Sequence, residues 1–126
     1  MRLLLDTHLL IWTLDGSGRL PPAAQGLIES ATRVHVSAAS IWECAIKIGL
    51  GKLRVDLGQL RHACTEAGFA ELPVTAAHAE RVLALPAVHR DPFDRLLVAQ
   101  ADVEPMRLLT ADALLARYSS NVVVCR

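Results

Sequence analysis

Four acidic residues of this chain share one kind of position, at or just after an apolar, strand-like stretch where a helix is expected to begin. Three of these stretches are Arg2–Leu5, Val34–Val36 and Leu108–Thr110, and one acid ends the sequence Asp91-Pro92-Phe93-Asp94. The four acids are Asp6, Glu43, Asp94 and Asp112. If the strands are parallel, their carboxyl ends meet at one edge of the sheet, where open α/β folds place their sites. We therefore expect the four carboxylates to gather there.

Carboxylates gathered at one sheet edge repel one another unless a cation holds them. Hard divalent cations such as Mg²⁺ or Mn²⁺ prefer oxygen ligands and suit a cluster of this kind. The residue types therefore predict a divalent metal site and metal-assisted phosphodiester chemistry.

Each acid also has a purely structural interpretation, because an acidic side chain near a helix N-terminus is stabilised by about 0.3–1 kcal/mol through the helix dipole. Glu43 follows Ser40 by three residues, the spacing of a capping box, and precedes Lys47 by four, which favours a helix ion pair. Asp6 fits this interpretation least well. Its neighbours are largely apolar, and a lone buried carboxylate is costly unless it is paired or bound to a metal.

The other two acids could also be explained by helix capping. Asp94 is the third helical residue if Asp91 is the N-cap and Pro92 opens the helix. Asp112 lies in a first turn if Thr110 caps that helix. Asp91 itself is assigned to capping, so it is left out of the metal-binding set.

Composition bounds the class of protein. The chain has 126 residues, 52% of them apolar, which predicts one domain, residues 1–126, with a substantial core. No apolar run approaches the roughly 18 residues that span a bilayer, so a soluble, cytoplasmic protein without membrane contact is expected. The formal net charge is zero, which disfavours a purely electrostatic nucleic-acid binder but not a nuclease whose metal supplies positive charge. The three cysteines and five histidines lack the spacing of a disulfide framework or a zinc site.

Alternating strand and helix patterns predict an α/β three-layer α/β/α sandwich around a mostly parallel sheet of about five strands. The expected strands are Leu3–Leu5, Arg33–Ser37, Phe69–Val74, Arg107–Thr110 and Val122–Cys125. The expected helices are Thr7–Leu14, Pro21–Ala31, Ile41–Leu50, Asp56–Ala67, Thr75–Leu85, Asp91–Val103 and Ala111–Tyr118.

Four segments resemble the motifs of PIN-domain ribonucleases, and among these the chain is most similar to the VapC toxins of type II toxin–antitoxin systems. The resemblance covers the whole chain in order, and the stretch from His89 to Ala101 is its most specific part. The segments are Leu4-Leu5-Asp6-Thr7-His8, Ser37-Ala38-Ala39-Ser40-Ile41-Trp42-Glu43, His89 to Ala101, and Leu109-Thr110-Ala111-Asp112. The acidic quartet of the family falls on Asp6, Glu43, Asp94 and Asp112 without a substitution.

The resemblance implies a PIN-like fold and a Mg²⁺- or Mn²⁺-dependent endoribonuclease that acts as a toxin, with transfer or ribosomal RNA as substrate. A bound metal would lower the pKa of its water and neutralise charge on the phosphate. Asp6 and Asp94 are the first candidates for direct ligands, followed by Asp112. Glu43 is expected either to ligate the metal or to hold or deprotonate the attacking water.

Supporting roles fall to residues around these acids. Thr7 and Thr110 are candidates for orienting carboxylates or a water, although Thr110 fits a helix cap equally well. Trp12 is a candidate for the RNA groove, or else belongs to the core or an interface. Residues that could meet RNA, or equally serve as surface or salt-bridge residues, are His8, Lys47, Lys52, Arg54, His89 and Arg95.

Other enzyme classes fit less well. A HAD-type phosphatase requires a second acid two residues after the first, where this chain has His8, and a receiver domain requires a late lysine where the only lysines are Lys47 and Lys52. The serious alternative is a non-catalytic PIN-like module that binds RNA or protein. Loss of an acid would favour it, and all four are present.

The apolar composition also predicts partners. With 52% apolar and 21% charged residues, a homodimer is expected, with the segment Pro21–Ala31 as one candidate interface. The resemblance adds a cognate VapB-like antitoxin whose carboxy-terminal segment folds onto an apolar groove near Trp12 and the segment Trp42–Leu50. That segment is expected to send an Arg or Lys into the acidic site.

Overall fold

A five-stranded sheet lies at the centre of the computed structural model, which describes residues 1–88 and 91–126. The strand order is β3-β2-β1-β4-β5, and all four neighbouring pairs are parallel. The strands are β1 (Arg2–Leu5), β2 (Arg33–Ser37), β3 (Ala70–Leu72), β4 (Arg107–Thr110) and β5 (Val122–Val124). The predicted parallel sheet is confirmed, and β1 occupies its middle.

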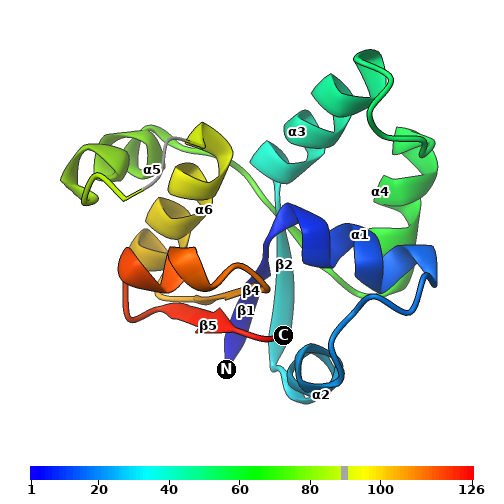
Figure 1. Ribbon diagram of the computed structural model, residues 1–126, viewed down its shortest axis with the longest axis horizontal. Helices are drawn as coiled ribbons and strands as arrows, with labels where there is room; N and C mark the ends of the chain where they lie inside the picture. The colour runs from blue at the N-terminus through cyan, green and yellow to red at the C-terminus, as the bar shows by residue number, and fades with distance from the viewer. Residues whose placement is uncertain (89–90) are drawn as a thin grey trace.

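Helices cover both faces of the sheet, as predicted for a three-layer sandwich (Figure 1). On one side lie α5 (Ala76–Arg81) and α6 (Pro92–Val103), with two 3-10 helices, η1 (Val82–Ala84) and η2 (Ala113–Arg117). On the other side lie α1 (Thr7–Asp15), α2 (Pro22–Ser30) and α4 (Leu57–Glu66). Helix α3 (Ala38–Gly49) extends from the end of β2 and contacts α1, α4 and α6.

The alternation of side chains along β1 produces this arrangement. Leu4 is buried in the core under α6, while Leu3 and Leu5 are buried on the opposite face under α1, α2 and α4. Because both faces are covered, the strands read as almost continuous apolar runs, which is typical of parallel sheets. Asp6 therefore follows a strand that is buried on both faces, at the middle of the sheet edge.

Most predicted helix boundaries hold within a few residues, and the differences have local causes. Helix α3 begins at Ala38 rather than Ile41, because Ser37 at the end of β2 caps it directly, accepting a hydrogen bond of 3.0 Å from the amide of Ala39. The predicted helix Thr75–Leu85 ends at Arg81 and continues as η1. Pro86 follows within two residues, which leaves room for only a tight turn.

The short helix expected over Ala111–Tyr118 is a 3-10 helix at Ala113–Arg117, and its N-cap is Asp112 rather than Thr110. It is too short between β4 and β5 to gain from α-helical propagation, and short 3-10 turns commonly serve as such connectors. The strand expected over Phe69–Val74 contains only Ala70–Leu72.

Among the described residues, no helix combines the length and the apolar composition that crossing a membrane requires.

Candidate active site

The carboxyl ends of β1, β2 and β4 place three of the four predicted acids at one edge of the sheet, and the start of α6 adds the fourth. Asp6 directly follows β1, Glu43 lies in α3 after β2, and Asp112 lies two residues beyond β4. Asp94 is the third residue of α6. The negative charges of Asp6, Glu43 and Asp112 each contribute to raising the pKa of Asp94, so the four carboxylates are close enough to interact.

Asp6 is 5% exposed and is held on both carboxylate oxygens. Its Oδ1 accepts a hydrogen bond of 2.9 Å from the amide of Leu9 as the N-cap of α1, and its Oδ2 accepts one of 2.5 Å from Thr110 Oγ1. Burial raises the pKa of Asp6, the hydrogen bonds from Leu9 and Thr110 and the nearby His8 oppose that rise, and Glu43 adds to it. The side chain is thus fixed in direction before any ligand arrives.

Glu43 is also 5% exposed, and its carboxylate is paired with Lys47 one turn later. The Lys47 Nζ to Glu43 Oε2 distance is 2.8 Å, as expected for a helix pair at this spacing. The alternative role predicted for Glu43, a capping box with Ser40, is wrong. The helix begins at Ala38, and Ser40 is a buried residue whose hydroxyl accepts a hydrogen bond of 3.0 Å from Thr7.

Asp94 is half-buried, and burial together with its acidic neighbours raises its pKa to about 7. After burial, the causes in descending order are Asp91, Asp6, Glu43 and Asp112. Asp91 is the N-cap of α6, as predicted, and accepts hydrogen bonds from the amides of Phe93 at 2.9 Å and Asp94 at 3.3 Å. A carboxylate with this pKa is only partly ionised at neutral pH, and a bound cation would favour its ionised form.

Asp112 is exposed at the rim of the site. Its Oδ1 accepts a hydrogen bond of 3.0 Å from the amide of Leu114, and its own amide donates one of 3.0 Å to Thr110 Oγ1. The Thr110 hydroxyl therefore contacts the two acids that follow β1 and β4, donating to the Asp6 carboxylate and accepting from the Asp112 backbone amide.

A cavity of about 370 Å³ joins three of the acids. Two aromatic side chains of α1 form part of its wall, His8 and Trp12, with ring centroids 6.1 Å apart. The complete lining is Asp6, His8, Trp12, Asp94, Ala111 and Asp112. A second hollow of about 430 Å³ lies between α1 and α4 and contains Arg54, but none of the four acids.

The donor set fits a hard divalent cation, because the side chains at the cavity are carboxylates whose mutual repulsion raises the pKa of Asp94. Within residues 1–88 and 91–126, however, no three His, Cys, Asp or Glu side chains already stand together closely enough to hold an ion. Asp6 accepts hydrogen bonds from Leu9 and Thr110, Glu43 is paired with Lys47, and Asp112 accepts a hydrogen bond from Leu114.

The remaining candidates lie in different surroundings. Thr7 is buried and donates to Ser40, which joins α1 to α3 rather than orienting a carboxylate. Arg95 donates to the carbonyls of Pro86 at 3.0 Å and Val82 at 3.2 Å and lies over the Tyr118 ring, so its contacts are structural. Lys52 and Arg54 are exposed beyond the end of α3. His89 lies outside the described residues.

Sequence reasoning missed a buried polar network beneath the site. Ser37 Oγ, at the end of β2, donates a hydrogen bond of 2.6 Å to Gln100 Oε1 of α6, and Gln100 Nε2 lies 3.4 Å from His78 Nδ1. His78 Nε2 in turn lies 2.6 Å from Glu104 Oε2. The signal was the single glutamine within the apolar run Leu96–Ala101, which needs partners once buried. This network fixes α6, and hence Asp94, against the end of β2.

Solved structures with the same fold include a toxin–antitoxin complex. A toxin–antitoxin complex from Klebsiella pneumoniae matches with a TM-score of 0.70 and 22% identity, covering 97% of this chain and 96% of that chain. VapBC2 from Rickettsia felis, bound to a DNA fragment from their promoter, matches with a TM-score of 0.70 and 14% identity over 98% and 97% of the two chains. FitAcB from Neisseria gonorrhoeae gives 0.66 and 17% over 98% and 96%.

These identities establish a shared fold. Among curated proteins, none matches the chain. The PIN domain family matches residues 3–121, a span that contains all four acids and, except for Arg2 at the start of β1, the strands β1 to β4. The chain therefore belongs to the PIN domain family.

Proposed function

We propose that this chain is the toxin of a type II toxin–antitoxin system and acts as a Mg²⁺- or Mn²⁺-dependent endoribonuclease. The observation that carries the proposal is the cavity at the carboxyl edge of the sheet, where Asp6, Asp94 and Asp112 converge with Glu43 in electrostatic reach. Membership of the PIN domain family and the likeness to toxin–antitoxin complexes support it.

Asp6, Asp94 and Asp112 would hold the cation, with Glu43 as a further ligand or as the group that holds the attacking water. A bound divalent cation supplies an activated water and positive charge beside the scissile phosphate. The residues of this chain do the positioning. Thr110 fixes Asp6, the N-cap Asp91 fixes the start of α6, and His8 and Trp12 form an aromatic wall against which an unpaired base can stack.

Cleavage of structured RNA by the purified protein tests this proposal. We expect cleavage of transfer or ribosomal RNA with Mg²⁺ or Mn²⁺ and none in excess EDTA, and we expect Asp6→Asn and Asp94→Asn to abolish it while retaining the native circular dichroism spectrum. Glu66→Gln is the matched control, since it removes one exposed carboxylate of α4 away from the cavity. Undiminished cleavage in EDTA would refute the mechanism. RNA binding without cleavage under any metal condition would favour the alternative, a non-catalytic PIN-like binding module.

A cognate VapB-like antitoxin is the proposed protein partner. A hollow of about 490 Å³ between α1 and α2 is lined by Trp12, Leu20 and Ile28, and Trp42, Ile46 and Leu50 are exposed along one side of α3. Both surfaces carry apolar side chains next to residues of the acidic site, and the hollow also contains the polar residues Thr13, Gln25 and Glu29. A segment lying on these surfaces could direct an Arg or Lys at the carboxylates. Co-purification with the product of a neighbouring gene, with loss of ribonuclease activity in the complex, is the expected result.

The chain is also proposed to form a homodimer, since it combines a high apolar content with several large apolar side chains that are exposed at its surface. These are Trp42, Ile46, Leu50, Val74, Leu83, Val103 and Leu114, in addition to Met1. The predicted interface segment Pro21–Ala31 forms α2, whose surface is largely exposed. Sedimentation equilibrium at micromolar concentration should give twice the chain mass, and a monomer would refute this assembly.

A further inference from the structure

The ion pair between Glu43 and Lys47 differs from an ordinary pair on a helix surface. The Glu43 side chain is 7% exposed, whereas the Lys47 side chain is 35% exposed, and their charged atoms are 2.8 Å apart. Exposed pairs at this spacing contribute little to stability. Here one partner is a buried carboxylate, and removing its counter-charge leaves that carboxylate without compensation.

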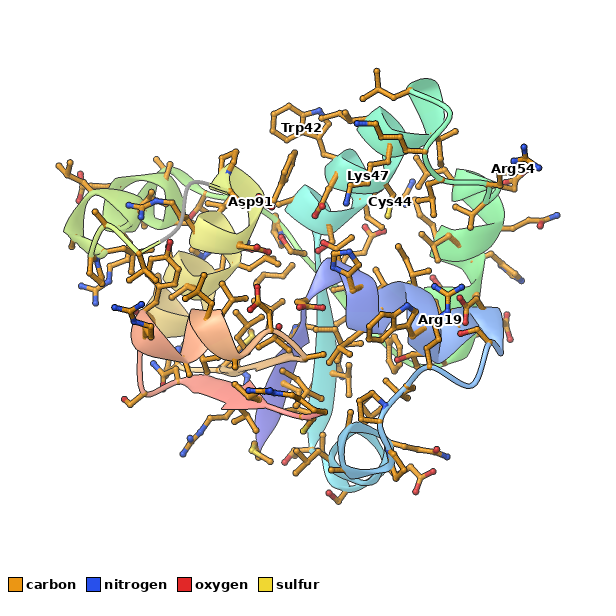
Figure 2. All side chains as sticks on the ribbon, in the orientation of Figure 1. Arg19, Trp42, Cys44, Lys47, Arg54 and Asp91 are labelled. Atoms are coloured by element: carbon orange, nitrogen blue, oxygen red, sulfur yellow. The ribbon has the colours of Figure 1, made fainter. Side chains whose placement is uncertain are left out.

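Lys47 also faces the acidic edge of the sheet. In Figure 2 its side chain points from α3 toward the region between α3 and α1, and Asp91 lies across from it at the start of α6. The ammonium group interacts with the carboxylates of Glu43 and Asp91, and Glu43 in turn acts on Asp6 and Asp94. A positive charge that belongs to the protein thus already stands at the margin of the acidic cluster.

The Lys47 ammonium group is bound to the Glu43 carboxylate, which is one of the candidate metal ligands. Glu43 Oε2 accepts the hydrogen bond from Lys47. A divalent cation that recruits this carboxylate must replace the Lys47 contact or share the carboxylate with it, because each contact draws on the same negative charge. This arrangement agrees with the finding that no three candidate ligands among the described residues stand ready to hold an ion.

We propose that Lys47 is a positioning residue that holds Glu43 outside the metal-binding set, so that Lys47 and a divalent cation compete for one carboxylate. Lys47 stabilises the metal-free protein and weakens its affinity for the metal, and it thereby sets the metal concentration at which the site fills. This inference rests on the proposed metal site, but it concerns metal binding and stability, which are measured without RNA.

The experiment titrates metal-free protein with Mn²⁺ by calorimetry and measures the melting temperature with and without Mn²⁺. For Lys47→Met we expect a lower metal-free melting temperature, a dissociation constant for Mn²⁺ that falls by about tenfold, and a larger rise in melting temperature on adding Mn²⁺. Lys47→Gln removes the charge but keeps a neutral hydrogen-bond donor for Glu43. It should also bind Mn²⁺ more tightly than the native protein, and it allows this measurement if Lys47→Met folds poorly. Lys47→Arg keeps the charge and should bind Mn²⁺ as the native protein does.

Two further variants separate the proposed role from simpler ones. In a Glu43→Gln background, Lys47→Met should leave the Mn²⁺ affinity unchanged, because the carboxylate for which the two cations compete is gone. A general charge effect would tighten binding in that background as well. Lys52→Met removes the only other lysine of the chain, which is exposed beyond α3, and should not alter Mn²⁺ affinity.

Unchanged or weaker Mn²⁺ binding in both Lys47→Met and Lys47→Gln would overturn the inference and leave Lys47 a structural residue alone. Tighter binding in these variants that persists with Glu43→Gln would overturn it too. Failure of the proposed ribonuclease function would appear differently, as Mn²⁺ binding without RNA cleavage.

Discussion

Thr110 and Asp6 are separated by 104 residues in sequence, yet the Thr110 hydroxyl donates a hydrogen bond of 2.5 Å to the Asp6 carboxylate. The contact exists because β1 and β4 are neighbours in the sheet, with Leu5 paired to Leu109, so that the residues following each pair lie side by side. Thr110 is fully buried, and its hydroxyl also accepts the amide of Asp112. One hydroxyl therefore sets the positions of two candidate ligands.

Replacing Thr110 by Val should impair the site while leaving the fold intact. The change removes both hydrogen bonds, and loss of contacts that orient ligands commonly costs about 10–100-fold in metal affinity or activity. Calorimetric titration with Mn²⁺ and RNA cleavage rates are the measurements. Thr110→Ser retains the hydroxyl and should keep most of both, so an equal loss in Thr110→Ser would indicate a packing effect instead.

The ionisation of Asp94 should make the metal-free protein less stable as the pH rises toward neutrality. The folded-state pKa of Asp94 is about 7, above its ordinary value of 3.8, so the folded state retains a proton that the unfolded state has released. The stabilising contribution is present below pH 3.8 and is lost as the pH rises through about 7. The raised pKa of Asp6 acts in the same direction.

Thermal melts in EDTA at several pH values between 5 and 8 measure this effect. Asp94→Asn should flatten the pH dependence relative to the native protein and should be the more stable of the two at pH 8. Identical pH profiles for the two proteins would contradict the assigned ionisation of Asp94.

His35 should give a pH effect of the opposite sign. It lies in β2 between Leu4 of β1 and Ala70 of β3, and neither ring nitrogen has a hydrogen-bond partner among the described residues. The pKa of His35 is lowered mainly by burial and further by the positive charges of Arg2 and Arg33, while the negative charge of Glu104 partly opposes this shift. Stability from this group is present above the unfolded value of 6.5 and is lost as the pH falls through the lower folded-state pKa.

His35→Val should therefore stabilise the protein, by about 1–3 kcal/mol if the unsatisfied nitrogens are its main defect, and more strongly at pH 5 than at pH 8. Valine also suits a strand position better than an unpaired imidazole. Denaturant unfolding at the two pH values checks both statements. A destabilised variant at pH 5 would show that the imidazole makes a favourable contribution that its surroundings do not reveal.

Divalent metal should raise the melting temperature, because a ligand that binds only the folded state stabilises it by mass action, by about 2.7 kcal/mol at a hundred times its dissociation constant. Asp112→Asn should raise the metal-free melting temperature by removing one charge of the cluster, and it should reduce the rise produced by Mn²⁺. Equal melting temperatures with and without saturating Mn²⁺ in the native protein would show that the carboxylates do not bind the ion.

Local sequence pattern is enough to predict most of the elements and their order. The N-cap Asp91 before Pro92 and the pairing of Glu43 with Lys47 depend on contacts within about one turn of chain, so local pattern is enough to predict them. The continuous apolar run Leu3–Leu5 is the pattern typical of a strand in a parallel sheet. Alternating strands and helices then favoured a parallel sheet, whose carboxyl edge collects the residues that follow each strand. The four acids are therefore predictable from the order of the elements.

The surroundings of each acid depend on contacts between segments that are distant in sequence. Thr110 could be a helix cap or a partner of Asp6, and the pairing of β1 with β4 made it the second. Ser40 had the spacing of a capping box, but the earlier start of α3 turned it inward to Thr7. Arg95 was a candidate for binding a phosphate, but in the fold its guanidinium group lies over the Tyr118 ring and donates to the backbone carbonyls of Pro86 and Val82. The partners of Thr110, Ser40 and Arg95 include residues more than twenty positions away in sequence. Burial and strand register determine which partner each side chain meets, and a local sequence pattern does not encode them.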